Sequence, residues 1–296
     1  MPISHEFEYV KPGTIEQAVA ILAERGDGAM VLAGGTDVVP QLRDDLIGPS
    51  ILVDIKGIDG LADIRRVGER LFLGPLVTFT DIIESGLIRE SFPLFYEVAV
   101  NVASVGVRNR GTIAGNISSA VPSCDSGPPL LVYDAQVLVI GPDGERTIRI
   151  EDWFTGPKKT DLQQGELVVG IELATAAESC GASYVKLRRY RGEDLAQASV
   201  AVLVSPEYRY HVAFGAVAPT PVRARKLEAA IEGLEPSDDM LADARKSIAR
   251  ETKPLTDIRS TAGYRAHMLE VMFERGVRAA VSRMKGEGPD YGTSLI

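Results

Sequence analysis

Two short segments hold the groups best suited to chemistry in this sequence, AGGTD at residues 33–37 and RGTIAGN at residues 110–116. Each follows an apolar stretch and combines glycine with a hydroxyl or amide side chain. Free backbone N–H groups in such turns form concave anion sites, and Thr and Asn add donors without adding charge. Two such segments that face each other could grip the two halves of a pyrophosphate. Neutral donors suit a protein with a formal net charge of −9, because they need no basic surface.

Each segment also has a purely structural explanation. Residues 33–37 are consistent with a simple turn in which Asp37 caps the next helix. Gly115 and Asn116 form a pair that favours a tight turn. Neither segment matches the G-x-G-x-x-G pattern that opens a long βαβ unit, nor the G-x-x-x-x-G-K-[ST] pattern of a P-loop. The spacing alone therefore indicates candidate phosphate-binding loops and disfavours both a Rossmann dinucleotide site and a P-loop.

Length and composition are typical of a globular protein. The 296 residues suffice for two or three domains, each with its own core. A net charge of −9 argues against nucleic-acid binding, which needs a basic face. No apolar run approaches the length that spans a bilayer, and residues 1–13 lack the pattern of a signal segment. We therefore expect a cytoplasmic protein.

The residues that most often bind metals or act in catalysis are sparse. Cys124 and Cys180 are too few and too far apart for a disulfide framework or a cysteine-ligated cluster. His5, His211 and His267 are scattered and suggest no zinc site. No His–carboxylate pair or cysteine nucleophile forms a convincing acid–base or covalent site. The sequence therefore predicts no metal site, no iron–sulfur centre and no catalytic residue of its own.

The elements that must position the two segments follow from hydrophobic periodicity and turn residues. The first helix begins at Thr14, where T-I-E-Q offers a capping box, and it ends at Gly26. Further helices are expected at 78–87, 92–102, 223–234, 238–251 and 260–285. Strands are expected at 29–33, 51–55, 61–67, 70–77, 135–141, 146–150, 167–173, 183–190, 199–205 and 210–218. Residues 142–144 make a hairpin turn, 174–182 a linker, and the loop-like tail 286–296 is either disordered or laid against a partner.

The pair of glycine segments, in this order and at this separation, resembles the FAD-binding subunit of the molybdenum hydroxylases. That family includes carbon monoxide, xanthine and nicotinate dehydrogenases. The similarity also covers FEYVKPGTIEQAVAIL, ILVDIKGI, GPLVTFTDI and SYVKLRRYRGEDLA, and so runs through most of the chain. In one departure, Ala114 stands where the family usually has the first glycine of T-I-G-G-N. A methyl group is compatible with that position if its backbone angles are ordinary.

The resemblance implies an α+β fold of the vanillyl-alcohol-oxidase type. In this fold two α+β subdomains hold FAD, and a C-terminal domain of antiparallel sheet and helices covers the edge of the flavin. The corresponding units here are residues 1–57, 58–175 and 176–296.

Carried over residue by residue, the resemblance places one side of the pyrophosphate on the first glycine segment and the other side on the second. Three further positions lie beyond them. The cofactor-binding residues implied in this way are Leu32, Ala33, Gly34, Gly35, Thr36, Asp37, Gly111, Thr112, Ala114, Gly115, Asn116, Asp125, Val168 and Lys186.

Alternatives remain open for the positions outside the glycine segments. Asp125 matches an acidic position that hydrogen-bonds the cofactor, but it is also consistent with a helix N-cap ahead of residues 128–129. Lys186 matches a lysine near the isoalloxazine, where a cation would stabilise charge on the reduced ring; the alternative is a solvated strand residue. Val168 matches a position whose backbone approaches the cofactor. Residues 188–194 either flank the ring or form a solvated loop.

The function implied by the resemblance is electron transfer by FAD. In the family, a large subunit oxidises the substrate at a molybdenum cofactor, [2Fe-2S] clusters in a small subunit carry the electrons, and FAD delivers them to an external acceptor. The chain would then be the medium subunit of a heterotrimer, commonly doubled. A [4Fe-4S]-containing variant needs more cysteines than the two present. The alternatives are a self-sufficient flavoprotein oxidoreductase and a non-catalytic nucleotide-binding subunit.

Overall fold

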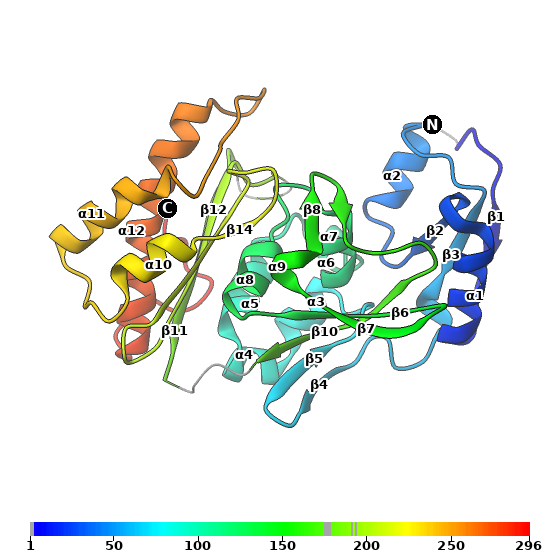
Figure 1. Cartoon of the computed structure of the whole chain (residues 1–296), viewed down its shortest axis with the longest axis horizontal. Helices are drawn as coiled ribbons and strands as arrows, with labels where there is room; N and C mark the ends of the chain where they lie inside the picture. The colour runs from blue at the N-terminus through cyan, green and yellow to red at the C-terminus, as the bar shows by residue number, and fades with distance from the viewer. Residues whose placement is uncertain (1–2, 175–178, 191, 193) are drawn as a thin grey trace.

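Within the described residues, three larger β-sheets follow one another along the chain, with a two-stranded ribbon beside the middle one and helices packed around them (Figure 1). The computed structural model describes residues 3–174, 179–190, 192 and 194–296. The N-terminal sheet lies at the right of Figure 1, the C-terminal sheet at the left, and the middle sheet between them. The sequence prediction of an α+β fold that ends in an antiparallel sheet with helices is therefore confirmed.

The N-terminal sheet is parallel, in the order β1-β3-β2, and helix α1 packs on it. Because parallel strands end at the same edge, the segments that follow β2 and β3 leave the sheet side by side. Its elements are β1 (Glu8–Val10), α1 (Ile15–Arg25), a short 3₁₀ turn (Gly26–Gly28), β2 (Ala29–Leu32), α2 (Val38–Arg43), β3 (Ile51–Asp54) and a second 3₁₀ turn (Ile55–Gly57).

Helix α1 begins and ends where the sequence predicts. Oγ1 of Thr14 accepts a hydrogen bond from N of Gln17 at 3.3 Å, and Gly26 ends the helix with φ of +52°. The predicted capping box is wrong in its second half. The Gln17 side chain accepts a hydrogen bond from N of Gly13, one residue before the cap, at 2.9 Å.

The middle sheet is antiparallel, in the order β4-β5-β10-β6-β7. The hairpin predicted around residues 142–144 is confirmed, because Gly141 pairs with Gly144. The strands of this part are β4 (Ile64–Val67), β5 (Arg70–Leu73), β6 (Gln136–Gly141), β7 (Gly144–Arg149) and β10 (Leu167–Ala174), with a separate ribbon of β8 (Phe154–Gly156) and β9 (Lys159–Thr160).

The helices of the middle part are shorter than predicted. Two helices were expected over 78–102, but the chain forms three. Ser85 leaves helical geometry and its Oγ accepts from N of Ile88, and Pro93 starts another helix at its first position. The helices are α3 (Phe79–Glu84), α4 (Gly86–Ser91), α5 (Pro93–Val100), α6 (Val105–Arg108), α7 (Ile113–Ser119), α8 (Gly127–Val132) and α9 (Ile150–Trp153).

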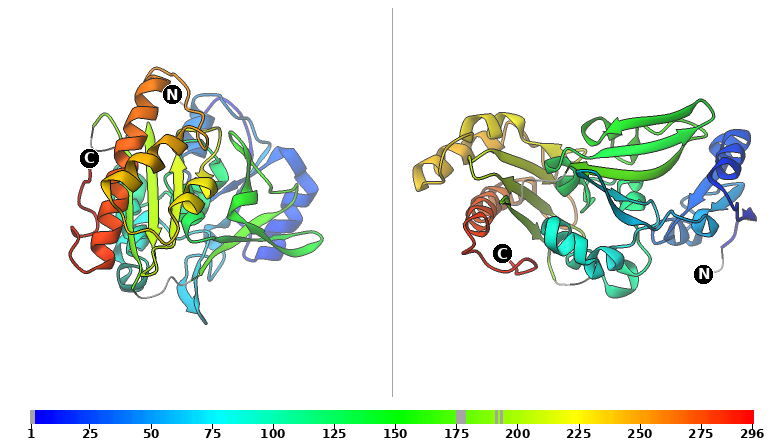
Figure 2. Two further views of the ribbon diagram at one scale, coloured as in Figure 1. Left: turned by 60° about the vertical axis from the view of Figure 1, so that its left-hand side comes forward. Right: turned by 90° about the horizontal axis from the view of Figure 1, so that it is seen from below.

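The C-terminal sheet is antiparallel and is covered on both faces (Figure 2). Side chains alternate along β12, so Val200 and Val202 face helix α12 while Ala201 and Leu203 join the core of the middle part. The elements are β11 (Gly181–Leu187), β12 (Ala198–Val204), β13 (Tyr210–Gly215), β14 (Val222–Arg223), α10 (Arg225–Ile231), α11 (Asp238–Ile248) and α12 (Ala262–Met284). In the predicted linker, residues 175–178 lie outside the described residues.

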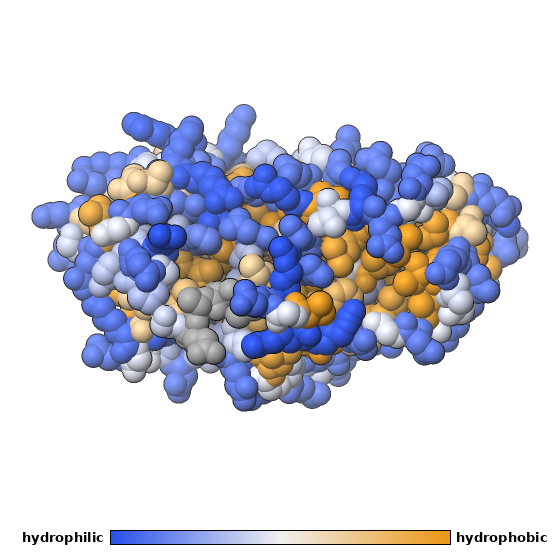
Figure 3. Space-filling view, turned by 60° about the horizontal axis from the view of Figure 1, so that its bottom comes forward, coloured by the Kyte–Doolittle hydropathy of each residue, from blue (hydrophilic) through white to orange (hydrophobic). Residues whose placement is uncertain are grey.

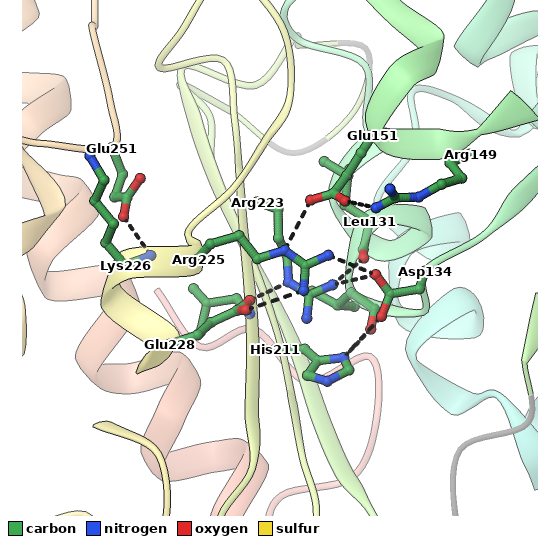
Figure 4. A network of polar contacts seen from close by, with 12 residues as sticks. Leu131, Asp134, Arg149, Glu151, His211, Arg223, Arg225, Lys226, Glu228 and Glu251 are labelled. Atoms are coloured by element: carbon green, nitrogen blue, oxygen red, sulfur yellow. Dashed lines mark hydrogen bonds and ion pairs between the residues drawn. The ribbon is translucent and has the colours of Figure 1, made fainter. Parts of the chain in front are cut away.

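An ion-pair network joins the C-terminal sheet to the middle part (Figure 4). Arg223 is buried, and its Nη1 donates to the carbonyl of Leu131 at 2.6 Å and to Asp134 at 3.1 Å. Arg225 bridges Asp134 and Glu151 at 3.1 and 3.0 Å. His211 Nδ1 lies 3.8 Å from Asp134 in the same network. His211 is therefore part of the contact between the C-terminal sheet and the middle part.

The tail 286–296 packs against its own chain, so the alternative of a disordered tail is wrong, while its placement against a partner stays a prediction. Arg283 pairs with Glu97 of α5 at 2.8 Å, with 4% and 1% of the two side chains exposed. The Glu97 carboxylate also accepts from N of Tyr184 at 2.8 Å and from N of Gly292 at 3.2 Å. Tyr291 OH accepts from N of Ala182 at 3.2 Å. A buried carboxylate thus connects the middle part, the C-terminal sheet and the tail.

Within the part of the chain that the structure describes, none of the helices combines the length and the apolar composition needed to cross a membrane.

We expect Arg283→Met to lower the free energy of unfolding by about 3 kcal/mol, because it leaves the Glu97 carboxylate buried without its cation. Urea unfolding followed by the fluorescence of Trp153 measures the change. Lys246→Met is the control, because the Lys246–Asp243 pair is exposed and should contribute less than about 0.5 kcal/mol. Equal losses in the two variants would contradict the assignment.

Candidate functional site

The first glycine segment leaves the N-terminal sheet at the end of β2 and needs its glycines for two different reasons. Gly35 has a φ of +76°, a backbone conformation that residues other than glycine rarely adopt. A Cβ added at Gly34 would lie 1.8 Å from the carbonyl oxygen of Arg110. The backbone of the first segment therefore lies directly against the backbone of the second.

Side chains join the same two segments. Asp37 accepts a hydrogen bond from Oγ of Ser119, at the end of α7. A Cβ added at Gly111 would lie 3.3 Å from Oγ1 of Thr36. The alternative role of Asp37 as a helix cap is wrong in part: the residue precedes α2, but its side chain makes no capping hydrogen bond. The two segments lie against each other in the structure, as the sequence analysis suggested.

The second segment is a helix start rather than a tight turn. Thr112 Oγ1 accepts from N of Gly115 at 3.0 Å, and Gly115 and Asn116 both lie inside α7. The tight-turn alternative is therefore wrong. Ala114 is only 3% exposed and packs in the core of the middle part, so its methyl group replaces the family's glycine without strain. Asn116 Oδ1 accepts from N of Ser126 at 3.1 Å, which ties α7 to the segment before α8.

Asp125 and Lys186, separated by 61 residues in sequence, form a buried ion pair. Lys186 Nζ lies 2.7 Å from Asp125 Oδ2, with 2% and 9% of the two side chains exposed. Tyr184 OH donates to Asp125 Oδ1 at 2.7 Å, and its burial together with the Asp125 charge raises the pKa of Tyr184. Both alternatives from the sequence are wrong: Ser126 is the residue that precedes α8, and Lys186 is not solvated.

Sequence reasoning missed Tyr184, although a signal for it was present. Successive side chains of a strand point to opposite faces, so Tyr184 and Lys186 share a face of β11. Val168 lies in β10 opposite Val139, beside an irregularity in the pairing, and its side chain is buried in the core cluster that also holds Ala114. Helix α7, which begins in the second glycine segment, contacts β10, the strand that holds Val168.

A cavity of ≈ 630 Å³ lies beside the ion pair. The carbonyl oxygen of Asn101 accepts from Lys186 Nζ at 3.1 Å and from Arg188 Nη1 at 3.4 Å, and both Asn101 and Arg188 line the cavity. The tail contributes Gly292, Thr293 and Ser294 to the wall. Of the polar run 188–194, Arg191 and Glu193 lie outside the described residues. The run therefore borders the cavity at Arg188 and Gly192.

Comparisons with known proteins agree along most of the chain. Residues 5–175 match the FAD binding domain in molybdopterin dehydrogenase, and residues 182–280 match the CO dehydrogenase flavoprotein C-terminal domain. The carbon monoxide dehydrogenase medium chain of Hydrogenophaga pseudoflava is 31% identical over 95% of this chain and 99% of its own length. The xanthine dehydrogenase FAD-binding subunit of Escherichia coli O157:H7 is 28% identical over 94% of this chain and 97% of its own.

A solved structure shows the same arrangement. Carbon monoxide dehydrogenase from Hydrogenophaga pseudoflava, lacking the Mo-pyranopterin moiety of its cofactor, superposes with a TM-score of 0.92 at 32% identity, covering 96% of this chain and 99% of the other. Fold and site together define an FAD-binding oxidoreductase subunit. The chain belongs to the family of FAD-binding medium subunits of the carbon monoxide dehydrogenase and xanthine dehydrogenase type.

The residues present fit FAD. The backbones of the two glycine segments approach so closely that a Cβ at Gly34 would overlap the carbonyl of Arg110. Oγ of Ser126, next to Asp125, is buried and has no hydrogen-bond partner within the described residues, so a donor or acceptor is left for a bound group. Groups of His, Cys, Asp and Glu arranged to hold a metal ion are not found among the described residues.

We expect Gly34→Ala to abolish FAD retention, because the added methyl group cannot coexist with the Arg110 carbonyl. The visible absorbance of the purified protein, before and after incubation with FAD, measures retention. Gly106→Ala is the matched control, since a Cβ there meets nothing within 4 Å. Normal FAD retention by Gly34→Ala would show that the contact between the segments is not needed.

We expect Cys124 to resist alkylation in the folded protein. Burial, with the neighbouring Asp125 charge, raises the pKa of Cys124 to about 12, so almost no reactive thiolate forms near pH 8. A Cys180→Ser variant should label with iodoacetamide at least about a hundredfold more slowly when folded than in denaturant. Mass spectrometry follows the labelling, and rapid labelling of the folded variant would show that this region opens.

Proposed function

We propose that the chain holds FAD with its diphosphate between the two glycine segments. Leu32, Ala33, Gly34, Gly35, Thr36 and Asp37 contact it from one side, and Gly111, Thr112, Ala114, Gly115 and Asn116 from the other. The backbone approach of Gly34 to Arg110 is the observation that carries this proposal, because it brings the peptide groups of the two segments together with no side chain at Gly34 to separate them. The N-terminal unit 1–57 and the middle unit 58–175 then share the cofactor.

The isoalloxazine ring is proposed to lie near Asp125 and Lys186, with the backbone of Val168 approaching the cofactor from β10. When bound, FAD supplies the ability to take up electrons singly and release them in pairs. Lys186 holds a positive charge where the reduced ring becomes more negative, while Asp125 and the Asn101 carbonyl fix the position of its Nζ. The C-terminal unit 176–296 contributes Lys186 and part of the adjoining cavity wall.

We further propose that the chain passes electrons from [2Fe-2S] clusters of a small subunit to an external acceptor. A large subunit with a molybdenum cofactor would oxidise the substrate, and the three subunits would form a heterotrimer that is doubled. The relatives' names support this arrangement, since one is the medium chain of a carbon monoxide dehydrogenase and the other the FAD-binding subunit of a xanthine dehydrogenase. Apolar surface is exposed over the N-terminal and middle half of one face, as expected of a surface that contacts a ligand or partner (Figure 3).

Reconstitution tests the proposal and separates it from its alternatives. The purified chain should bind FAD and gain its visible spectrum, but should oxidise no substrate until the two partner subunits are added. Turnover by the FAD-loaded chain alone would favour a self-sufficient flavoprotein. Failure to bind FAD would overturn both and leave a non-catalytic nucleotide-binding role.

We expect Lys186→Met combined with Asp125→Asn to keep FAD but to lower its two-electron midpoint potential by about 30 mV or more. In the proposed placement Lys186 is the charge nearer the ring, so its loss disfavours the more negative, reduced ring more than the loss of the Asp125 anion favours it; 30 mV corresponds to about 1.4 kcal/mol. Changing both residues avoids leaving one buried charge unpaired. Spectroelectrochemical titration measures the potential, with Lys246→Met as the control. An unchanged potential would place the ring away from this pair.

A further inference from the structure

Lys56 lies beside the first glycine segment, but it is not among the residues assigned to the cofactor site so far. Strands β2 and β3 are parallel neighbours, with Leu32 paired to Asp54. The chain therefore leaves both strands at the same edge of the sheet, and residues 33–34 and 55–56 meet there. Lys56 reaches across this edge with its side chain 31% exposed.

The ammonium group of Lys56 joins the two segments. Nζ donates to the carbonyl oxygen of Ala33 at 3.1 Å and lies 2.7 Å from Oδ1 of Asp54. The same Oδ1 accepts from the backbone N of Lys56 at 2.9 Å, and the other oxygen, Oδ2, accepts from Tyr9 OH on β1. All three strands of the N-terminal sheet thus contribute to holding this lysine.

Asp54 is well placed to keep Lys56 in one position. Its side chain is 4% exposed, so it cannot be satisfied by bulk water. Burial by itself would raise the pKa of Asp54, but hydrogen bonds from Lys56 and Tyr9 outweigh it and hold the pKa below its ordinary value. Asp54 therefore remains charged near neutral pH and retains its cation.

The contact fixes the orientation of one peptide group in the loop. The carbonyl of Ala33 and the N–H of Gly34 belong to the same planar trans peptide, so they point in opposite directions. Anchoring the carbonyl on Lys56 therefore turns the N–H of Gly34 away from Lys56. Glycine leaves the peptide groups next to it free to rotate. Gly34 and Gly35 therefore have no side chain that would hold this part of the loop in one orientation.

We infer that Lys56, held by Asp54 and Tyr9, is a positioning residue for the loop that binds the diphosphate of FAD. This inference rests on the proposed placement of FAD between the two glycine segments. The Lys56 charge also lies at the edge of that loop, where it favours a bound anion over water. Both effects act on the diphosphate and not on the ring.

Three variants of the full chain test this inference. Lys56→Met should weaken FAD binding about tenfold, and Lys56→Arg should restore it to within about threefold, because a guanidinium can still donate to Ala33 and pair with Asp54. Lys246→Met is the matched control, since Lys246 also lies 2.7 Å from an aspartate but on the exposed surface of α11. Titration of FAD into the FAD-free protein, followed by flavin fluorescence, gives the dissociation constants.

Three further measurements separate positioning from a merely structural role. FAD-free Lys56→Met should have a lower thermal midpoint, because Asp54 loses its cation, but its far-ultraviolet circular dichroism at 25 °C should match that of the unmodified protein. The visible spectrum of bound FAD should not change, because the ring environment is untouched, whereas competition by ADP, which carries the same diphosphate, should weaken along with FAD binding.

The outcomes are distinct. If the unmodified chain binds no FAD, the proposed function fails. If it binds FAD and Lys56→Met binds equally well, the role of Lys56 is overturned while the function stands. An altered circular-dichroism spectrum of FAD-free Lys56→Met at 25 °C, or unchanged ADP competition, also overturns it in favour of a structural contact.

Discussion

Direct contact between two stretches of main chain is the constraint on which this structure depends. Gly34 lies so close to the carbonyl of Arg110 that even a methyl group would not fit. The first stretch follows a strand of the parallel sheet and the second leads into helix α7 of the middle part, so the contact also fixes how these two parts of the chain meet. Because peptide groups rather than side chains form the facing surfaces, an acidic protein can present donors to a diphosphate without a basic surface.

Buried charge pairs determine how the third unit is placed. Asp125–Lys186, Glu97–Arg283 and the network around Arg223 each join the C-terminal unit to the middle part. Such pairs add little net stability, because desolvation offsets their attraction, but a mispaired charge would be costly. They therefore favour one arrangement of the two units. The Asp125–Lys186 pair has a second role in our proposal, since the same cation faces the flavin.

Much of the fold could be predicted from the sequence, because periodicity and turn residues act locally. Thr14, Gly26 and the hairpin at residues 142–144 are local signals, and each has the predicted effect. Prediction failed where local signals compete. The region 78–102 divides at Ser85 and Pro93, and Gly115 with Asn116 joins a helix because Thr112 caps it. Ser85 and Pro93, like Gly115 and Asn116, allow a turn but do not require one.

The sequence by itself determined the residue types at the site, the two glycine segments and the family to which the chain belongs. Those features depend on residue order and spacing, which are visible in one dimension. Only the tertiary structure decided that Asp125 pairs with Lys186, that the tail returns to Glu97, and that Lys56 reaches Ala33. These contacts join residues between 23 and 195 positions apart, and no local propensity specifies which of many possible partners a buried charge will meet.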